Sequence, residues 1–137
     1  MTTILLLSCV SKKLAHKAKA KDLYISPLFK MNFQFSQSFN PDKIFILSAK
    51  YGLIDIDTEI EPYDTTLNLM RSPEKKEWAH NVLQNLRNIA DLNKDTFIFL
   101  AGENYRKYLI PHIKNYTIPL QGLGIGKQLH YLKEKLQ

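Results

Sequence analysis

The chain is poor in cysteine and lacks a long hydrophobic run. Its 137 residues contain one cysteine, Cys9, which excludes an intramolecular disulfide and a cluster of thiolate metal ligands. A reducing, cytoplasmic setting fits this usage. The apolar run 4–10 is too short for a signal peptide or a membrane span, and no basic segment precedes it. We therefore expect a cytoplasmic protein without a membrane partner.

Motifs for common cofactors and metals are also missing. The four histidines are scattered along the chain, and no two have metal-ligand spacing. No serine lies in a nucleophile elbow, and the glycines match neither the Walker spacing nor the dinucleotide fingerprint. We therefore expect neither a bound metal nor a cofactor.

The composition is that of one basic domain. With 45% hydrophobic residues, 137 residues can bury one core and are too few for two ordinary domains, so we expect a single domain over residues 1–137. The net charge of +6 arises from 19 Lys and Arg against 13 Asp and Glu. This excess favours nucleic acid or nucleotide phosphates as partners.

Strand and helix patterns alternate along the chain. Apolar runs at residues 4–7, 43–47, 96–100 and 116–118 predict strands, and helices are expected at 27–39, 73–92, 104–113 and 128–136. Ser26 and Ser72, each before a proline, are the expected caps of the first two helices. The alternation predicts an α/β fold: a single three-layer domain with a four-stranded, mostly parallel sheet and helices on both faces.

Polar residues and glycines follow the predicted strands. Gly52, Gly102, Gly122, Gly124 and Gly126 all lie just past a strand, as do Ser8, Ser11, Ser48, Lys50, Tyr51 and Glu103. In an open parallel sheet, ligands bind at the carboxyl ends of the strands. The set predicts a site at this edge, although each glycine alone is also typical of a turn. Residues 122–127 could form a backbone cradle for one phosphate or a turn that enters a helix.

An acidic segment interrupts this basic chain. Between Tyr51 and Met70 there are five carboxylates and no Lys or Arg. Glu61 and Asp64 flank Pro62 and Tyr63, whose restricted backbone would hold both carboxylates in a fixed direction, so they are candidates for a general base or a substrate clamp. The basic run 12–21 is either a flexible loop or a solvated face.

Tyr24, Tyr51, Tyr63 and Tyr105 lie near predicted strand ends or in loops. Their rings could stack on a planar base while their hydroxyls form hydrogen bonds. Half-buried packing is the alternative explanation.

Several segments carry a resemblance to a known family. They are residues 9–12, 22–26 with Phe29, 46–53, 60–64 and 119–126. In these segments the chain resembles an uncharacterised bacterial, archaeal and phage family related to the YaaA peroxide-stress proteins. The resemblance implies a YaaA-like α/β domain with DNA binding and protection from oxidative damage. It also implies a looser alliance with base-processing enzymes of the uracil-DNA glycosylase type.

These observations predict a protein that processes a nucleobase, with cleavage or exchange of an N-glycosidic bond and with DNA preferred to RNA. Such chemistry needs aromatic rings around a flipped base, a phosphate grip and a carboxylate. The expected catalytic residues are Asp64, Glu61 and Lys50, and the expected substrate-binding residues are Ser11, Lys12, Tyr24, Ser48, Tyr51, Gly52, Tyr63, Gly102, Tyr105, Gly122 and Gly126.

Two alternatives remain open. One is a non-catalytic DNA-binding protein of the YaaA type, with residues 12–21 and Arg106-Lys107 contacting phosphates. The other is a small nucleotide-binding domain.

Overall fold

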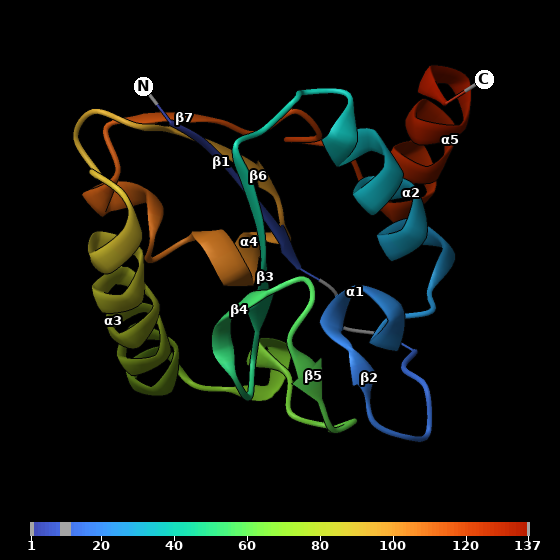
Figure 1. Cartoon of the computed structure of the whole chain (residues 1–137), viewed down its shortest axis with the longest axis horizontal. Coiled ribbons are helices and arrows are strands. Elements are labelled where there is room, and N and C mark those ends of the chain that lie inside the picture. Colours follow the sequence, from blue (N-terminus) through green and yellow to red (C-terminus); the bar gives the residue numbers. More distant parts are fainter. Residues whose placement is uncertain (1, 9–11, 137) are drawn as a thin grey trace.

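A five-stranded sheet forms the centre of the protein, in the order β4-β3-β1-β6-β7 (Figure 1). The computed structural model describes residues 2–8 and 12–136. Strands β1 (Thr3–Ser8), β3 (Lys43–Ser48), β6 (Thr96–Leu100) and β7 (Asn115–Thr117) pair in parallel. Strand β4 (Gly52–Asp55) runs antiparallel to β3. The mixed α/β class and the mostly parallel sheet are therefore as predicted.

The number of strands differs from the prediction. All four expected strands are present, but β4 adds a fifth at the edge of the sheet. A separate two-stranded sheet pairs β2 (Ala18–Lys19) with β5 (Glu59–Ile60). The prediction missed these strands because four-residue and two-residue segments are too short to show a hydrophobic period.

Helices cover both faces of the main sheet (Figure 1). Helix α3 (Ser72–Ile89) packs on one face, and α2 (Pro27–Gln37) and α5 (Ile125–Lys135) pack on the other. The short elements are α1 (Ala20–Leu23), α4 (Glu103–Arg106) and the 3₁₀ turns η1 (Leu67–Leu69) and η2 (Ile110–His112). None of the helices within the described residues combines the length and hydrophobicity needed to cross a membrane.

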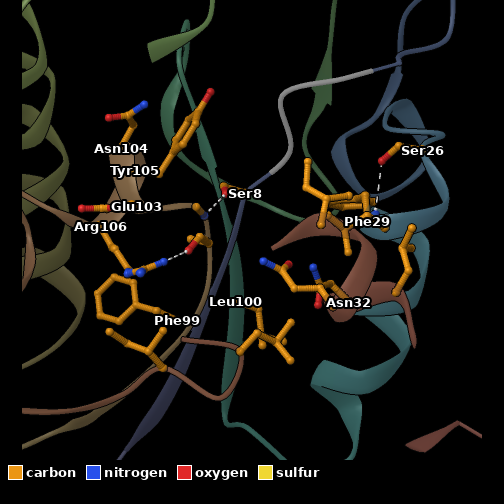
Figure 2. Close-up of a pocket in the computed structure, with 18 of the residues that line it drawn as sticks. Ser8, Ser26, Phe29, Asn32, Phe99, Leu100, Glu103, Asn104, Tyr105 and Arg106 are labelled. Carbon is orange, nitrogen blue, oxygen red and sulfur yellow. Dashed lines mark hydrogen bonds between the residues drawn. The ribbon is translucent and has the colours of Figure 1, made fainter. Parts of the chain in front are cut away.

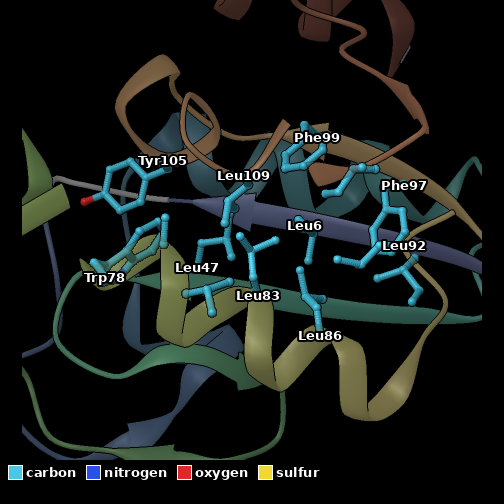
Figure 3. Packing of buried hydrophobic residues seen from close by; sticks show 14 of the residues in the cluster. Leu6, Leu47, Trp78, Leu83, Leu86, Leu92, Phe97, Phe99, Tyr105 and Leu109 are labelled. Atoms are coloured by element: carbon cyan, nitrogen blue, oxygen red, sulfur yellow. The ribbon is translucent and has the colours of Figure 1, made fainter. Parts of the chain in front are cut away.

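Strand β1 divides the hydrophobic interior into two clusters, because successive strand residues point to opposite faces. Ile4 and Leu6 pack on the α3 side, whereas Leu5 and Leu7 pack on the side of α2 and α5. Figure 3 shows the first cluster, in which residues of α3 meet side chains of β1, β3 and β6.

Local signals set the helix boundaries with small differences from the prediction. The Ser26 side chain caps α2 by accepting a hydrogen bond from the Phe29 N–H at 3.2 Å, as expected. Helix α3 starts at Ser72, so its N-cap is Arg71 and the expected serine cap is wrong by one residue.

Two other predicted helices also differ. The helix expected over 104–113 is replaced by α4 and η2, with Pro111 inside the 3₁₀ turn. Helix α5 begins at Ile125, three residues before the predicted start at Gln128, and Gly124 is its N-cap.

The topology creates a switch point between β1 and β6. From β1 the chain crosses to β3 on one side, and from β3 it crosses to β6 on the other side of β1. The two crossovers carry helices on opposite faces, so their helices diverge at the carboxyl ends of β1 and β6. A crevice is expected there on topology alone.

Candidate functional site

A pocket of about 460 Å³ lies at this switch point. Ser8 from the end of β1 and Leu100 from the end of β6 line it. Ligand sites usually enclose roughly 300–1,000 Å³, so the volume suits a small organic group. We call this cavity the switch-point pocket.

Two walls face each other across the strand ends (Figure 2). The first includes Glu103, Asn104, Tyr105 and Arg106 from α4, and the second includes Phe29 and Asn32 from α2. Phe99, Leu100, Ile118 and Leu120 add apolar surface, and Ile125, Gln128 and Leu129 come from α5. An apolar lining with a few polar groups is typical of a small-molecule site.

Most polar groups of the first wall are held by neighbours. The Gly102 N–H donates to the Ser8 hydroxyl at 3.0 Å, and the Arg106 guanidinium donates to the Ala101 carbonyl at 2.7 Å. Asn104 donates to the Asn68 side chain at 2.6 Å. These bonds fix the loop after β6 and the start of α4 against β1 and η1.

Two polar groups of the pocket could interact with a ligand. Glu103 is the one carboxylate residue among the described lining residues, and it is exposed. Asn32 is only 4% exposed, and its Oδ1 atom has no hydrogen-bond partner within the described part of the chain. The pocket therefore combines an acid–base group with a buried hydrogen-bond acceptor.

A cluster of hydroxyls lies at the end of the neighbouring strand β3. The Ser48 hydroxyl donates to the Tyr63 hydroxyl at 2.9 Å, and the Tyr24 and Tyr63 hydroxyls are 2.5 Å apart. The Ser48 Oγ atom also accepts from the Tyr51 N–H at 3.0 Å. We call Tyr24, Ser48, Tyr51 and Tyr63 the tyrosine cluster.

The rings of the tyrosine cluster pack edge to face. Tyr63 lies 5.6 Å from Tyr51 and 6.4 Å from Tyr24, measured between ring centroids. The Lys13 ammonium is 4.5 Å from the Tyr63 ring centroid, and the Lys50 ammonium is 5.4 Å from that of Tyr51. Such cation–π contacts hold positive charge at this edge of the sheet.

Phe29 links the tyrosine cluster to the switch-point pocket. Its ring lies 5.1 Å from the Tyr24 ring, and the same side chain lines the pocket. The two groups of residues therefore share one edge of the protein.

The expected catalytic residues lie outside the pocket lining. Glu61, Asp64 and Lys50 are exposed, and the carbonyl of Glu61 accepts a hydrogen bond from the Tyr51 hydroxyl at 3.4 Å. Lys12 is also exposed, and its carbonyl accepts from the Ile25 N–H at 3.0 Å. Ser11 is outside the described residues. The structure thus brings Tyr24, Ser48, Tyr51 and Tyr63 together and places the charged candidates around them.

The expected glycines separate into different places. Gly102 lines the pocket beside Tyr105, which is 2% exposed and packs against Trp78. Gly52 and Gly122 have φ angles of +72° and +84°, a conformation that glycine adopts without strain. Gly126 lies in the first turn of α5, beside a separate hollow.

The acidic segment pairs with the basic run. Lys21 lies 3.1 Å from Asp57, and Lys17 lies 3.9 Å from Glu59. These contacts join the segments that form β2 and β5. No three His, Cys, Asp or Glu side chains of the described residues gather into a metal-binding group.

Asn32 is the main residue that the sequence did not point to. In the sequence, the apolar residues Leu28, Met31, Phe35 and Phe39 recur at helical spacing, whereas the buried residues of α2 are Phe29, Asn32, Phe35 and Ser36. The available signal was Asn32, three residues after Phe29, and Ser36, four residues after Asn32. Polar residues on the buried face of a helix need hydrogen-bond partners, which directs attention to them.

Comparison with known proteins identified one family. A model of a family of unknown function (DUF6884) matches residues 4–134. The chain belongs to this family. No curated protein and no solved structure matched the chain. The match does not test the resemblance to the YaaA proteins or to the glycosylases, and both stay predictions.

Proposed function

We propose that this member of the DUF6884 family binds a nucleobase in the switch-point pocket and cleaves its N-glycosidic bond. One observation carries the proposal: a cavity of about 460 Å³ at the carboxyl edge combines a largely apolar lining with the Glu103 carboxylate. Enzymes that act on bases enclose the flipped base between apolar side chains and read its polar edge. The volume and the lining suit that task.

Glu103 is the group best placed to assist the reaction. In hydrolysis, the bond between C1′ and the base nitrogen breaks, and its electron pair leaves on the base. A water oxygen bonds to C1′ as Glu103 accepts a proton from that water. Glu103 then releases this proton to solvent and the base nitrogen takes one proton from solvent, so the carboxylate is restored. A carboxylate also stabilises the positive charge that develops on the sugar.

The tyrosine cluster has a positioning role in this proposal. Tyr24 contacts the ring of Phe29, and the hydroxyl contacts from Ser48 to Tyr63 and on to Tyr24 fix the ring of Tyr24. Lys13 and Lys50 place positive charge on these rings, where a phosphate of the substrate would be attracted. DNA is the polymer partner that we propose first.

The test measures release of free base from single-stranded DNA oligonucleotides that each contain one modified or deaminated base. We expect Glu103→Gln to slow the release by about 100-fold or more, the size of a general-base contribution. Glu77→Gln, an exposed carboxylate on α3, is the matched control and should leave the rate unchanged. If Asp64→Asn abolishes release and Glu103→Gln does not, the catalytic carboxylate is Asp64, as the sequence predicts.

One observation favours a second candidate, nucleic-acid binding without chemistry. A hollow between α3 and η2 is lined by Lys76, His80, Arg87, Tyr108 and His112, and no carboxylate is among its described lining residues. The pKa of Tyr108 is lowered by a hydrogen bond with the Ser72 side chain and then by nearby lysines.

This candidate predicts binding that depends on salt. Replacing Lys76 and Arg87 by glutamine should reduce the slope of log K against log salt by about 0.9 for each lost phosphate contact to duplex DNA. Unchanged slopes would remove this surface from the interface.

A further inference from the structure

Asn32 is a buried polar residue that faces the switch-point pocket. It lies in the middle of α2, is 4% exposed and lines the cavity (Figure 2). Its Oδ1 atom has no hydrogen-bond partner within the described residues. Buried side-chain oxygens are nearly always paired in folded proteins, and an unpaired one calls for an explanation.

Neighbouring polar side chains of the pocket do not share this property. The Gln128 amide donates to the Leu123 carbonyl at 2.7 Å, and the Arg106 guanidinium donates to the Ala101 carbonyl at 2.7 Å. The hydroxyl of Ser26, at the start of α2, accepts from the Phe29 N–H. Asn32 therefore lines the cavity with a side chain whose buried oxygen is unpaired among the described residues, while these groups are bonded within the protein.

We propose that Asn32 is the specificity residue of the pocket and that its Oδ1 atom accepts a hydrogen bond from an N–H group of a planar heterocycle. This inference rests on the proposed function, because it takes the heterocycle to be a nucleobase held in the switch-point pocket. The inference specifies the ligand group that the site requires, which is a ring N–H or an exocyclic N–H on the edge of the heterocycle that faces Asn32.

This requirement predicts that methylation of the ligand nitrogen weakens binding. A methyl group on the nitrogen removes the donor and leaves the buried Asn32 oxygen unpaired. Sites built around a buried hydrogen bond reject ligands that lack the matching group much more strongly than apolar pockets reject a change in size. The protein should therefore bind bases with a free N–H and exclude their N-methylated forms.

The first experiment measures the binding of four pairs of free bases by calorimetry. The pairs are uracil and 3-methyluracil, hypoxanthine and 1-methylhypoxanthine, adenine and N6,N6-dimethyladenine, and cytosine and N4,N4-dimethylcytosine. We expect at least one parent base to bind about tenfold or more tightly than its methylated form, the effect of leaving one buried partner unpaired.

Variants assign the effect to Asn32. Asn32→Leu keeps a similar side-chain shape. It should lower the affinity for the parent base to the affinity for its methylated form, without lowering the midpoint temperature of thermal unfolding. Ser36→Ala is the matched control, because Ser36 is buried on the same helix, its hydroxyl bonds to the Phe33 carbonyl, and it does not line the pocket. A parent base that binds Asn32→Leu as tightly as wild type overturns the proposal.

A second experiment separates this inference from the proposed function. Succinimide and N-methylsuccinimide are titrated into ¹⁵N-labelled wild-type protein, and the side-chain amide signals of Asn32 are followed. Shifts with succinimide alone support an N–H-reading site, even if no nucleobase binds and the proposed function fails. Equal responses to both imides, or none to either, overturn the role of Asn32.

Discussion

Replacing Tyr63 by phenylalanine tests the tyrosine cluster most directly. The substitution keeps the ring and removes the hydroxyl that accepts from Ser48 at 2.9 Å and lies 2.5 Å from the Tyr24 hydroxyl. Ser48 is fully buried and Tyr24 is 1% exposed, so water cannot readily replace the lost contacts. Losing a hydrogen-bond partner in such a place costs about 1–3 kcal/mol of the free energy of unfolding.

A double-mutant cycle isolates the contact between Ser48 and Tyr63. Ser48→Ala removes the donor and also removes the acceptor of the Tyr51 N–H. This second loss is the same in the single and the double variant, so it cancels from the coupling energy. Because both substitutions break the same bond, the double variant should lose less stability than the sum of the single losses. We expect a coupling of about 0.5–1.5 kcal/mol, the range of one net hydrogen bond.

The assay is urea unfolding followed by tryptophan fluorescence. Trp78 is the single tryptophan of the chain, and its indole N–H donates to the Ser48 carbonyl at 2.8 Å, so it reports on this region. Tyr116→Phe is the control, since Tyr116 is 41% exposed and its ring contact with Phe99 is kept. A Tyr63→Phe protein as stable as the control, or strictly additive losses in the cycle, would refute the hydroxyl network.

Three further predictions concern stability. Gly52→Ala should cost about 1–2 kcal/mol because its φ angle is +72°, whereas Gly126→Ala, in α5 with open space around an added methyl group, should cost nothing in the same denaturation assay. Leu86→Ala should cost about 2–5 kcal/mol, because Leu86 is fully buried against the sheet, and unfolding by urea measures this loss. The backbone N–H groups of Asp91 and Thr2 lower the pKa of Asp95, so Asp95→Asn should destabilise the protein at neutral pH. That difference should shrink as the pH falls through the lowered pKa of Asp95, and a constant difference across an acid titration would contradict the assignment.

The parallel strands β1, β3 and β6 were predictable because each is a short, mostly apolar run bounded by polar residues. Burial on both faces requires such runs, and β1 satisfies the requirement with four fully buried residues, Ile4 to Leu7. The start of α2 was predictable for a similar reason, since a serine cap followed by proline is a local signal that needs no tertiary information.

Elements that depend on tertiary contacts were missed. Strand β4 is a four-residue hairpin partner of β3, and it exists because Gly52 turns the chain back along Ser48. The buried face of α2 also differs from its most regular apolar spacing, because Asn32 and Ser36 are buried whereas Leu28 and Met31 are only partly buried. A hydrophobic pattern cannot indicate a helix that buries polar side chains beside a cavity.

The sequence predicted the location of the pocket better than it predicted the residues that line it. Glycines and hydroxyls after the strands indicated the carboxyl edge, and Gly102 and Tyr105 do line the pocket there. Asn32 comes from the opposite wall, and its role depends on how α2 packs over β1. No local pattern encodes that packing.

The acidic segment shows how charge along a sequence differs from charge in space. Read along the chain, its carboxylates suggest an acidic pocket, but Asp57 and Glu59 face Lys21 and Lys17 on exposed surface. Exposed ion pairs contribute little stability, so these contacts mainly offset charge between β2 and β5. The carboxylate that faces the cavity comes instead from Glu103, in a stretch whose neighbours Arg106 and Lys107 are basic. Glu103 lines the cavity and the carboxylates of the acidic segment do not, and this placement favours Glu103 as the source of the reactive group in the proposed reaction.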